Sequence, residues 1–257
     1  MNDQNKPLQD SRILITRPKL QSKQLSELIE QAGGQAILFP VLEIIAPNNT
    51  HLIHQQLSKT EAWDWIIFTS ANAVNHAITV TNNQLPIKPI TKIAAIGLNT
   101  ANSLSKHGIT VNLIPNISSS EGLASTIMQL TEHRNCLIIK GEGGRNILQK
   151  CLIQHGGMVT TVDVYRRICP DSNTGSLLDQ WRCQAIDYVT VTSVEGLNNL
   201  IQLIGDQGFE LLQKTTIVAL SQRIRDAGIK TGLSNIVVAS STSDKGIFET
   251  IVHCTKT

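Results

Sequence analysis

The sequence lacks the features of membrane-spanning and secreted proteins. No apolar run reaches the roughly 18 residues that a transmembrane helix requires, and residues 1–6 contain no apolar core of a signal peptide. The cysteines number five and none are spaced Cys-x-x-Cys, so neither a disulfide framework nor a paired-thiol motif is indicated. We therefore expect a cytoplasmic protein with reduced thiols.

The chain also has little net charge. Lys and Arg number 22 against 20 Asp and Glu, which gives a formal net charge of +2. A nucleic-acid-binding protein needs a basic patch or stripe, so we expect neither nucleic acid nor membrane as a partner. An anionic ligand would have to be bound by a few well-placed groups. With 257 residues, 41% of them hydrophobic, the chain is long enough for two domains that each bury a core.

Several catalytic and cofactor signatures are absent. The sequence contains neither Gly-x-x-x-x-Gly-Lys-Ser/Thr, which binds nucleotide phosphates, nor Gly-x-Ser-x-Gly, which is typical of serine hydrolases. Residues 141–146 resemble a dinucleotide-binding loop, but Asn146 replaces its last glycine. His51 and His54 have no Cys, Asp or Glu nearby at ligand spacing, which favours surface histidines over a metal site. We expect no metal and no cofactor.

What the chain does contain is a duplication. The segment that ends at Ser70 matches the segment that ends at Ser193, 123 residues later. Four further pairs keep a spacing of 123 or 124 residues: Gly33 with Gly156, Gly97 with Ser221, Gly108 with Gly232, and Gly122 with Gly246. Two similar lobes usually form a cleft, and clefts between lobes are where small ligands bind.

Each copy alternates strands and helices. Residues 12–16 form a β-branched run, residues 20–29 have helical spacing of apolar positions, and Gly33 and Gly34 end that helix before a second strand at 35–39. The strands are apolar at nearly every position, which indicates parallel sheets covered on both faces. We therefore predict an α/β protein with two similar lobes, each a parallel sheet flanked by helices. Short strands are also predicted at 111–114 and 236–239.

Two extended segments break the pattern. Residues 39–46 and 162–168 correspond across the duplication, and each is followed within two residues by a proline, Pro47 or Pro170, which disfavours a helix. If both segments connect the lobes, one lobe is built from the two ends of the chain. Periodicity alone does not distinguish this arrangement from two lobes in succession.

Hydroxyl, glycine and basic residues follow the predicted strands. In open α/β sheets ligands bind beyond the carboxyl ends of the strands, where helix N-termini attract anions. The alternative is that Ser and Thr only cap the following helices, and both roles are compatible because a cap leaves other N–H donors free. The candidate ligand-binding residues are Thr16, Arg17, Ser70, Asn72, Gly97, Thr100, Ser120, Glu121, Gly122, Lys140, Gly141, Arg145, Arg166, Thr192, Ser193 and Ser221.

Tyr165 is a separate candidate. It is one of two tyrosines and lies in the extended segment 162–168, beside Arg166. Its phenol could donate a proton or a hydrogen bond to a leaving group. The alternative is a packing tyrosine with a satisfied hydroxyl, and Tyr188, which begins a strand, is interpreted that way.

Taken together, these segments resemble the uroporphyrinogen-III synthase family. The resemblance rests on ILITRP at 13–18, FP and EI within 39–44, DWIIFTSANAV at 64–74, IG with Thr100, SEGL at 120–123, KGEGGR at 140–145, YRR at 165–167 and Thr192 with Ser193. It implies two lobes joined by the two-stranded linker 39–46 and 162–168, with a cleft between them. One lobe would comprise 1–38 and 169–257, and the other 47–161.

The resemblance also implies an activity. The family cyclises hydroxymethylbilane, a linear tetrapyrrole rich in carboxylates, with loss of water and inversion of the terminal ring, and uses no cofactor. By this resemblance Tyr165 would assist loss of the hydroxyl. Many relatives have Thr-Ala where this chain has Ile224 and Arg225, so here Ser221 or backbone N–H groups would serve. A monomer that transiently contacts the preceding pathway enzyme is expected.

Two other functions remain open from the residues alone. A non-catalytic two-lobed protein that binds or senses a small molecule would share the duplicated α/β lobes. An NAD-linked enzyme would depend on the incomplete glycine motif at 141–146. Only the product formed from hydroxymethylbilane distinguishes these functions from the family activity.

Overall fold

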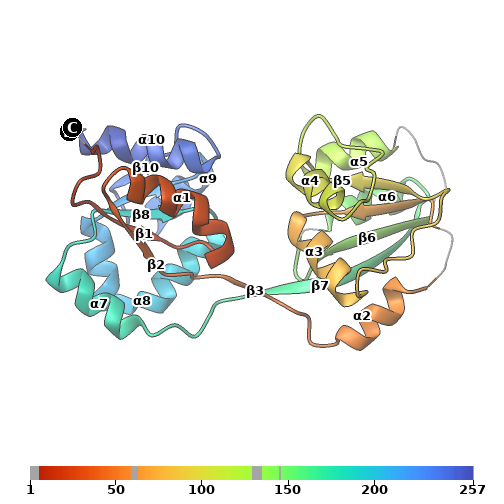
Figure 1. Ribbon diagram of the computed structural model, residues 1–257, viewed down its shortest axis with the longest axis horizontal. Coiled ribbons are helices and arrows are strands. Elements are labelled where there is room, and N and C mark those ends of the chain that lie inside the picture. Colours follow the sequence, from red (N-terminus) through yellow and green to blue (C-terminus); the bar gives the residue numbers. More distant parts are fainter. Residues whose placement is uncertain (1–5, 60–62, 129–134, 145, 257) are drawn as a thin grey trace. The chain divides into compact units, whose positions relative to one another are not determined.

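The computed structural model describes residues 6–59, 63–128, 135–144 and 146–256. The chain divides into two units, one made of Met1–Glu43 with Ile168–Thr257 and the other of Ile44–Arg167 (Figure 1). The first unit therefore contains both ends of the chain. No helix of the described part is long and apolar enough to cross a membrane.

The first unit contains a five-stranded sheet with the order β10-β9-β8-β1-β2. Its neighbouring strands are all parallel: β1 (Arg12–Ile15), β2 (Gln35–Leu38), β8 (Tyr188–Val191), β9 (Thr216–Ala219) and β10 (Ile236–Val238). Its helices are α1 (Lys19–Gln31), α7 (Thr174–Cys183), α8 (Val194–Lys214), α9 (Gln222–Lys230) and α10 (Asp244–Thr255). Helix α8 is interrupted at Gly205, whose φ of 59° is in the left-handed region that favours glycine.

The second unit contains a five-stranded sheet with the order β3-β7-β6-β4-β5. The strands are β3 (Glu43–Ile45), β4 (Trp65–Phe68), β5 (Lys92–Ala95), β6 (Asn135–Gly141) and β7 (Met158–Ile168), and β4 to β7 are paired in parallel. Its helices are α2 (Thr50–Leu57), α3 (Ala71–Val80), α4 (Leu98–Lys106), α5 (Ser120–Met128) and α6 (Ile147–Gln154).

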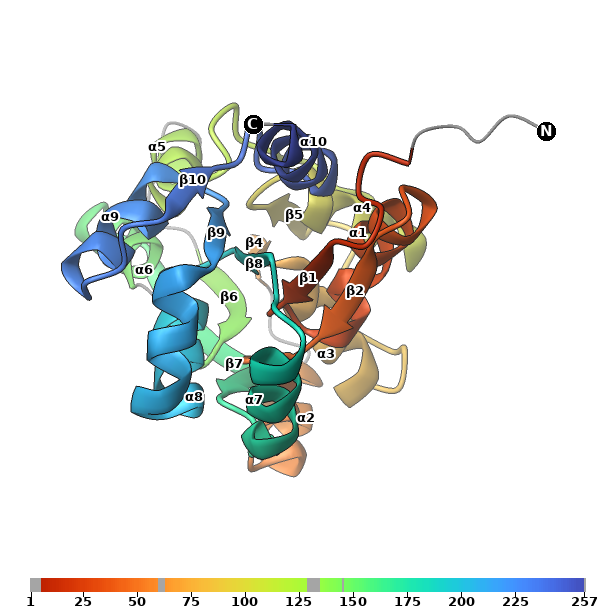
Figure 2. The ribbon, with the colours of Figure 1, turned by 90° about the vertical axis from the view of Figure 1, so that its left-hand side faces the viewer.

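Both sheets bury both faces, as their continuous apolar strands predict. In the first unit Leu14 packs with α7, α8 and α9, whereas Ile13 and Ile15 pack with α1 and α10. Figure 2 shows these two groups of helices on opposite sides of the first sheet. In the second unit Phe68 packs with α2, α3 and α4, and Ile67 packs with α5 and α6.

The two sheets repeat the same order of strands. The order β9-β8-β1-β2 in the first unit corresponds to β5-β4-β6-β7 in the second, with each pair of matching strands 123 or 124 residues apart. The second unit forms these strands from one continuous stretch of chain. The first unit takes β1 and β2 from one end of the chain and β8 to β10 from the other, so it is a permuted copy.

The predicted strand at 111–114 is wrong. The structure contains only an isolated bridge there, between Leu113 and Ala94. The N–H of Ile93 donates to the side-chain oxygen of Asn112 at 2.7 Å, so a side chain takes the place of a backbone carbonyl in the ladder. Pro115 follows closely and has no N–H to continue the pairing. The predicted strand at 236–239, in contrast, is present as β10.

Both extended segments contain residues that form strands of the second sheet. Segment 39–46 contains β3, the edge strand beside β7, and segment 162–168 is the second half of β7, which runs without a break from Met158. The division between the units falls after Glu43 and again after Arg167. Residues 162–167 are therefore part of the second unit.

The Asn112 contact predicts a stability effect. Asn112→Ala leaves the N–H of the buried residue Ile93 without its acceptor, so we expect the free energy of unfolding to fall by about 1–2 kcal/mol. Asn112→Asp keeps an acceptor oxygen in the same place and should remain close to the parent protein. Denaturant unfolding of the three proteins measures this difference, and equal stability of the Ala and Asp variants would contradict it.

Candidate active site

Helix N-termini with hydroxyl caps line the carboxyl edge of the second sheet. After β4, the Ser70 hydroxyl accepts the N–H of Ala73 at 3.0 Å and caps α3. Before α5, the Ser119 hydroxyl accepts the N–H of Gly122 at 2.9 Å. Gly97 begins α4 after β5 with extended backbone. A cap accepts one amide of the first turn, so other amides there remain able to donate to a ligand.

The first unit repeats these caps. The Ser193 hydroxyl accepts the N–H of Gly196 at 2.9 Å and the Ser243 hydroxyl accepts the N–H of Gly246 at 3.1 Å. Ser221 precedes α9, but its hydroxyl caps none of the described amides of that helix. The capping interpretation is therefore confirmed for Ser70 and Ser193, 123 residues apart, and the ligand-binding role of both residues stays a prediction.

Two of the candidate hydroxyls lie in the interior. Thr16 is 3% exposed and its hydroxyl donates to the carbonyl of Thr190 at 2.7 Å, which ties β1 to β8. Thr100 is also 3% exposed, within α4. The structure therefore places both side chains in the interior and does not present them at the sheet edge.

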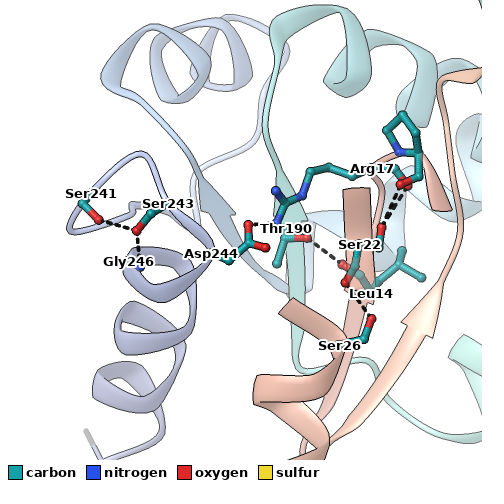
Figure 3. Close-up of polar contacts among 10 residues, drawn as sticks. Leu14, Arg17, Ser22, Ser26, Thr190, Ser241, Ser243, Asp244 and Gly246 are labelled. Carbon is teal, nitrogen blue, oxygen red and sulfur yellow. Dashed lines mark hydrogen bonds and ion pairs between the residues drawn. The ribbon is translucent and has the colours of Figure 1, made fainter. Parts of the chain in front are cut away.

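The two cations at equivalent strand ends each face a carboxylate of their own unit. Arg17, after β1, lies with Nη2 2.6 Å from Oδ1 of Asp244, the first residue of α10, although this contact lacks the alignment of a hydrogen bond (Figure 3). Lys140, in β6 and 123 residues later, lies with Nζ 3.3 Å from Oδ1 of Asp163 and 3.4 Å from Oδ1 of Asn146. The side chains of both cations are largely buried. To bind Arg17 or Lys140, a ligand carboxylate would have to displace Asp244 or Asp163, or bind the cation beside it.

A β-bulge sets the direction of Tyr165. Lys140 is paired with Asp163, but the next residue, Gly141, is paired with Tyr165, so Val164 is an extra residue in β7. Strand alternation would put consecutive residues on opposite faces. With the bulge, Val164 and Tyr165 both pack in the core on the α3 side of the sheet.

Tyr165 is 7% exposed and its ring is held by three neighbours. Its hydroxyl lies 3.2 Å from Oγ of Ser70, and its ring lies 5.6 Å from the His76 ring, centroid to centroid. A Cβ on Gly141 would overlap the Tyr165 ring, so only glycine fits beneath it. The packing role that the sequence left open is therefore present, and the hydroxyl still lies at the N-terminus of α3.

The remaining candidates occupy the same sheet edges. Asn72 lies in the first turn of α3, Ser120 and Glu121 begin α5, and Thr192 precedes the cap Ser193. Arg166 follows Tyr165 in β7, and its buried Nε has no hydrogen-bond partner among the described residues. Arg145 lies outside the described residues.

Sequence reasoning missed His76. Nothing in the local sequence pattern around this residue indicates a contact with a strand residue 89 positions away. Within the described part of the chain, no three His, Cys, Asp or Glu residues are grouped so that they could hold a metal ion.

Ser70 and Ser193 cap equivalent helices, but Ser70 also contacts Tyr165, which predicts a difference in stability between their alanine variants. Ser70→Ala and Ser193→Ala should each lower the free energy of unfolding by about 1 kcal/mol through loss of a cap. Ser70→Ala should cost about 1 kcal/mol more, because it also removes the partner of the Tyr165 hydroxyl. In a Tyr165→Phe background the two substitutions should cost the same. A difference that persists in that background would show that the Ser70–Tyr165 contact does not cause it.

Comparison with solved structures confirms the predicted fold class. A crystal structure of a mutant uroporphyrinogen III synthase from the extremely thermophilic bacterium Thermus thermophilus matches with a TM-score of 0.62 and 14% identity, covering 96% of this chain and 99% of that one. Uroporphyrinogen-III synthetase from Helicobacter pylori 26695 also matches with a TM-score of 0.62 and 14% identity, over 95% and 99%. At this identity the likeness supports the two-sheet α/β architecture alone.

Sequence comparison goes further. Residues 23–249 match the family model described as uroporphyrinogen-III synthase HemD. A putative uroporphyrinogen-III synthase from Methanothermobacter thermautotrophicus is 30% identical over 204 residues, which cover 77% of this chain and 80% of that protein. The uroporphyrinogen-III synthase of Escherichia coli K12 is 26% identical over 246 residues, 93% and 99% of the two chains. Since the family model spans most of the chain, the protein belongs to the uroporphyrinogen-III synthase family.

Proposed function

We propose that the protein is a lyase of tetrapyrrole biosynthesis that converts hydroxymethylbilane to uroporphyrinogen III. Membership of the family supports this reaction, in which water is lost, the terminal ring is inverted and the macrocycle closes. The repeated helix N-termini at the carboxyl edges of both sheets suit a substrate rich in carboxylates, because backbone N–H groups and the positive end of the helix dipole both favour anions.

The observation that carries the proposal is the placement of the Tyr165 phenol at the N-terminus of α3. The Ser70 hydroxyl accepts the N–H of Ala73, which uses one of its two acceptor positions. It can then donate its own proton to the Tyr165 oxygen, 3.2 Å away. In that arrangement the phenol proton is free to be donated to a substrate.

In the proposed mechanism Tyr165 acts as a general acid. The carbon–oxygen bond of the hydroxymethyl group breaks, the phenol proton is transferred to the departing oxygen, and water leaves. The terminal ring then attacks the electrophilic carbon, and the proton released when the ring system regains its aromatic form returns to the phenolate. Because the electrophile is intrinsically reactive, the largest contribution of the protein is to hold the flexible chain in the conformation that closes.

The other expectations belong to the same proposal. We propose that the remaining candidate residues apart from the buried Thr16 and Thr100, including Arg17, Lys140, Arg145, Arg166 and Ser221, contribute to carboxylate binding with the helix N-termini. The family resemblance implies that the reaction needs no cofactor and that the protein acts as a cytoplasmic monomer with transient access to the enzyme that makes its substrate.

The product formed from hydroxymethylbilane tests the proposed activity. We expect the protein, incubated with freshly generated hydroxymethylbilane, to yield the type III isomer of uroporphyrinogen, separated from type I by chromatography after oxidation. Spontaneous closure without protein yields the type I isomer and provides the control. If only type I forms with the protein present, the proposed activity is wrong.

Removal of the phenol tests the role of Tyr165. Tyr165→Phe keeps the ring, so we expect kcat to fall by about 100-fold at most, near the lower end of the range for loss of a general acid, because the hydroxyl leaves readily. Tyr188→Phe is the matched control: this residue is also 7% exposed, and its hydroxyl lies 3.2 Å from Oγ1 of Thr255 in the first unit. Initial rates of type III formation should be unchanged by Tyr188→Phe. Equal rates for both variants would remove Tyr165 from the mechanism.

A further inference from the structure

The His76 side chain lies against the ring of Tyr165. The two ring centroids are 5.6 Å apart and the ring planes are inclined by 30°. This separation is within the 4.5–7 Å at which aromatic rings attract one another in offset or tilted arrangements. His76 is in the sixth position of α3, the helix capped by Ser70, so the same helix contacts both the ring and the hydroxyl of Tyr165.

Two other contacts of Tyr165, those with Gly141 and Ser70, do not set the rotation of its ring. Gly141 lies beneath the ring but has no side chain that could restrain it, and the recorded hydrogen-bond contact of the Ser70 hydroxyl is with the phenol oxygen. The Ser70 hydroxyl, 3.2 Å from the phenol oxygen, restrains the position of that one atom. It does not restrain rotation of the Tyr165 ring about the bond that joins it to Cβ. His76 is the aromatic neighbour of Tyr165 among the described residues, and the remaining packing around the ring comes from the apolar core cluster that also contains Val164.

His76 packs as a neutral ring. Burial lowers the pKa of its imidazole, because the charged form is disfavoured away from water. Near neutral pH the side chain therefore contributes an uncharged aromatic surface. This agrees with its position beside the apolar core residues Ala73 and Ala77 of the same helix.

The duplication shows that this helix position has a structural task. The residue 123 positions after His76 is Asn199, the sixth position of α8, which is capped by Ser193. Its side-chain amide donates to the carbonyl of Val41 at 2.9 Å. Val41 and Leu42 are the counterparts of Val164 and Tyr165. In both units, therefore, the sixth residue of the capped helix contacts the equivalent segment of the repeat, which follows β2 in the first unit and lies within β7 in the second. The contact is made by an amide in one copy and by an aromatic ring in the other.

We propose that His76 is a positioning residue that fixes the ring of Tyr165 so that its hydroxyl stays at the N-terminus of α3. This inference rests on the proposed role of Tyr165 in loss of the hydroxyl. His76 touches neither the substrate nor the reacting atoms in this proposal, and it acts only through the orientation of Tyr165. The neighbouring helix and strand would fold without it, but the phenol would be less ordered.

Chemical nitration measures the orientation of Tyr165 without any activity assay. Tetranitromethane modifies accessible tyrosines, and mass spectrometry of peptides separates Tyr165 from Tyr188, the internal reference that is equally buried. We expect His76→Ala and His76→Gln to raise the nitration rate of Tyr165 relative to Tyr188 by at least about 3-fold, because an unsupported ring opens more often. His76→Phe should stay close to the parent protein, and so should Asn199→Ala. An unchanged ratio in both His76→Ala and His76→Gln would overturn the proposal.

Kinetics then separate positioning from general damage. His76→Ala should lower kcat by about 2- to 10-fold, which corresponds to the energy of one aromatic pair, with little change in KM. His76→Phe should restore kcat. In a Tyr165→Phe background the His76→Ala substitution should have no further effect, whereas an equal loss in both backgrounds would overturn the proposal. If Tyr165→Phe alone leaves kcat unchanged, the role of the phenol is wrong, and the nitration ratio still decides whether His76 orients the ring.

Discussion

The candidate active site depends on one constraint, the register shift between β6 and β7. If the register continued unshifted, with Val164 paired to Gly141, strand alternation would direct Tyr165 to the face of the sheet covered by α5 and α6, away from Ser70. The shift is possible because the residue opposite Tyr165 is Gly141, where any side chain would overlap the phenol ring. A bulge in a parallel pair costs ladder hydrogen bonds, and here it brings the phenol to the α3 side of the sheet. The position of the Tyr165 ring therefore depends on the absence of a side chain at Gly141.

Charge distribution at the strand ends favours backbone amides as the main binding groups for carboxylates. Arg17 and Lys140 already face Asp244 and Asp163, which are tethered in the same unit and so compete at a high local concentration. A charge pair that is largely buried gains little from exchanging one carboxylate for another. Helix N-termini have no such built-in competitor beyond the single hydroxyl cap. If the proposed substrate is bound in this way, a protein with a net charge of +2 needs no basic surface to bind it.

The sequence predicted most of the strands and their parallel pairing, and it offered capping as one role for the hydroxyl residues, because these follow from local pattern and from the duplication. Ser70 and Ser193 are caps in both copies, as the spacing of 123 residues indicated. The contacts of Tyr165 could not be predicted, since they depend on the register between β6 and β7 and on α3, which is about 90 residues away in the chain. The pairing of Arg17 with Asp244 joins residues more than 200 positions apart and has no local signal. The missing strand at 111–114 shows a further limit, because whether Asn112 replaces a ladder carbonyl depends on its side-chain conformation.

The two copies differ at the position of Tyr165, the proposed acid, and are alike at positions that cap helices. Ser70 and Ser193 make the same bond to the third residue of their helices, yet the phenol of Tyr165 corresponds to Leu42, which has no group to donate. The supporting residue has changed in step with it, from the amide of Asn199 to the ring of His76. A backbone carbonyl is held well by an amide, but a phenol ring requires an apolar partner that does not compete for its hydroxyl. The supporting residue therefore differs in the way that the proposed role of Tyr165 requires. If the phenol donates a proton as proposed, that step belongs to the second unit, whereas capped helix N-termini are present in both units.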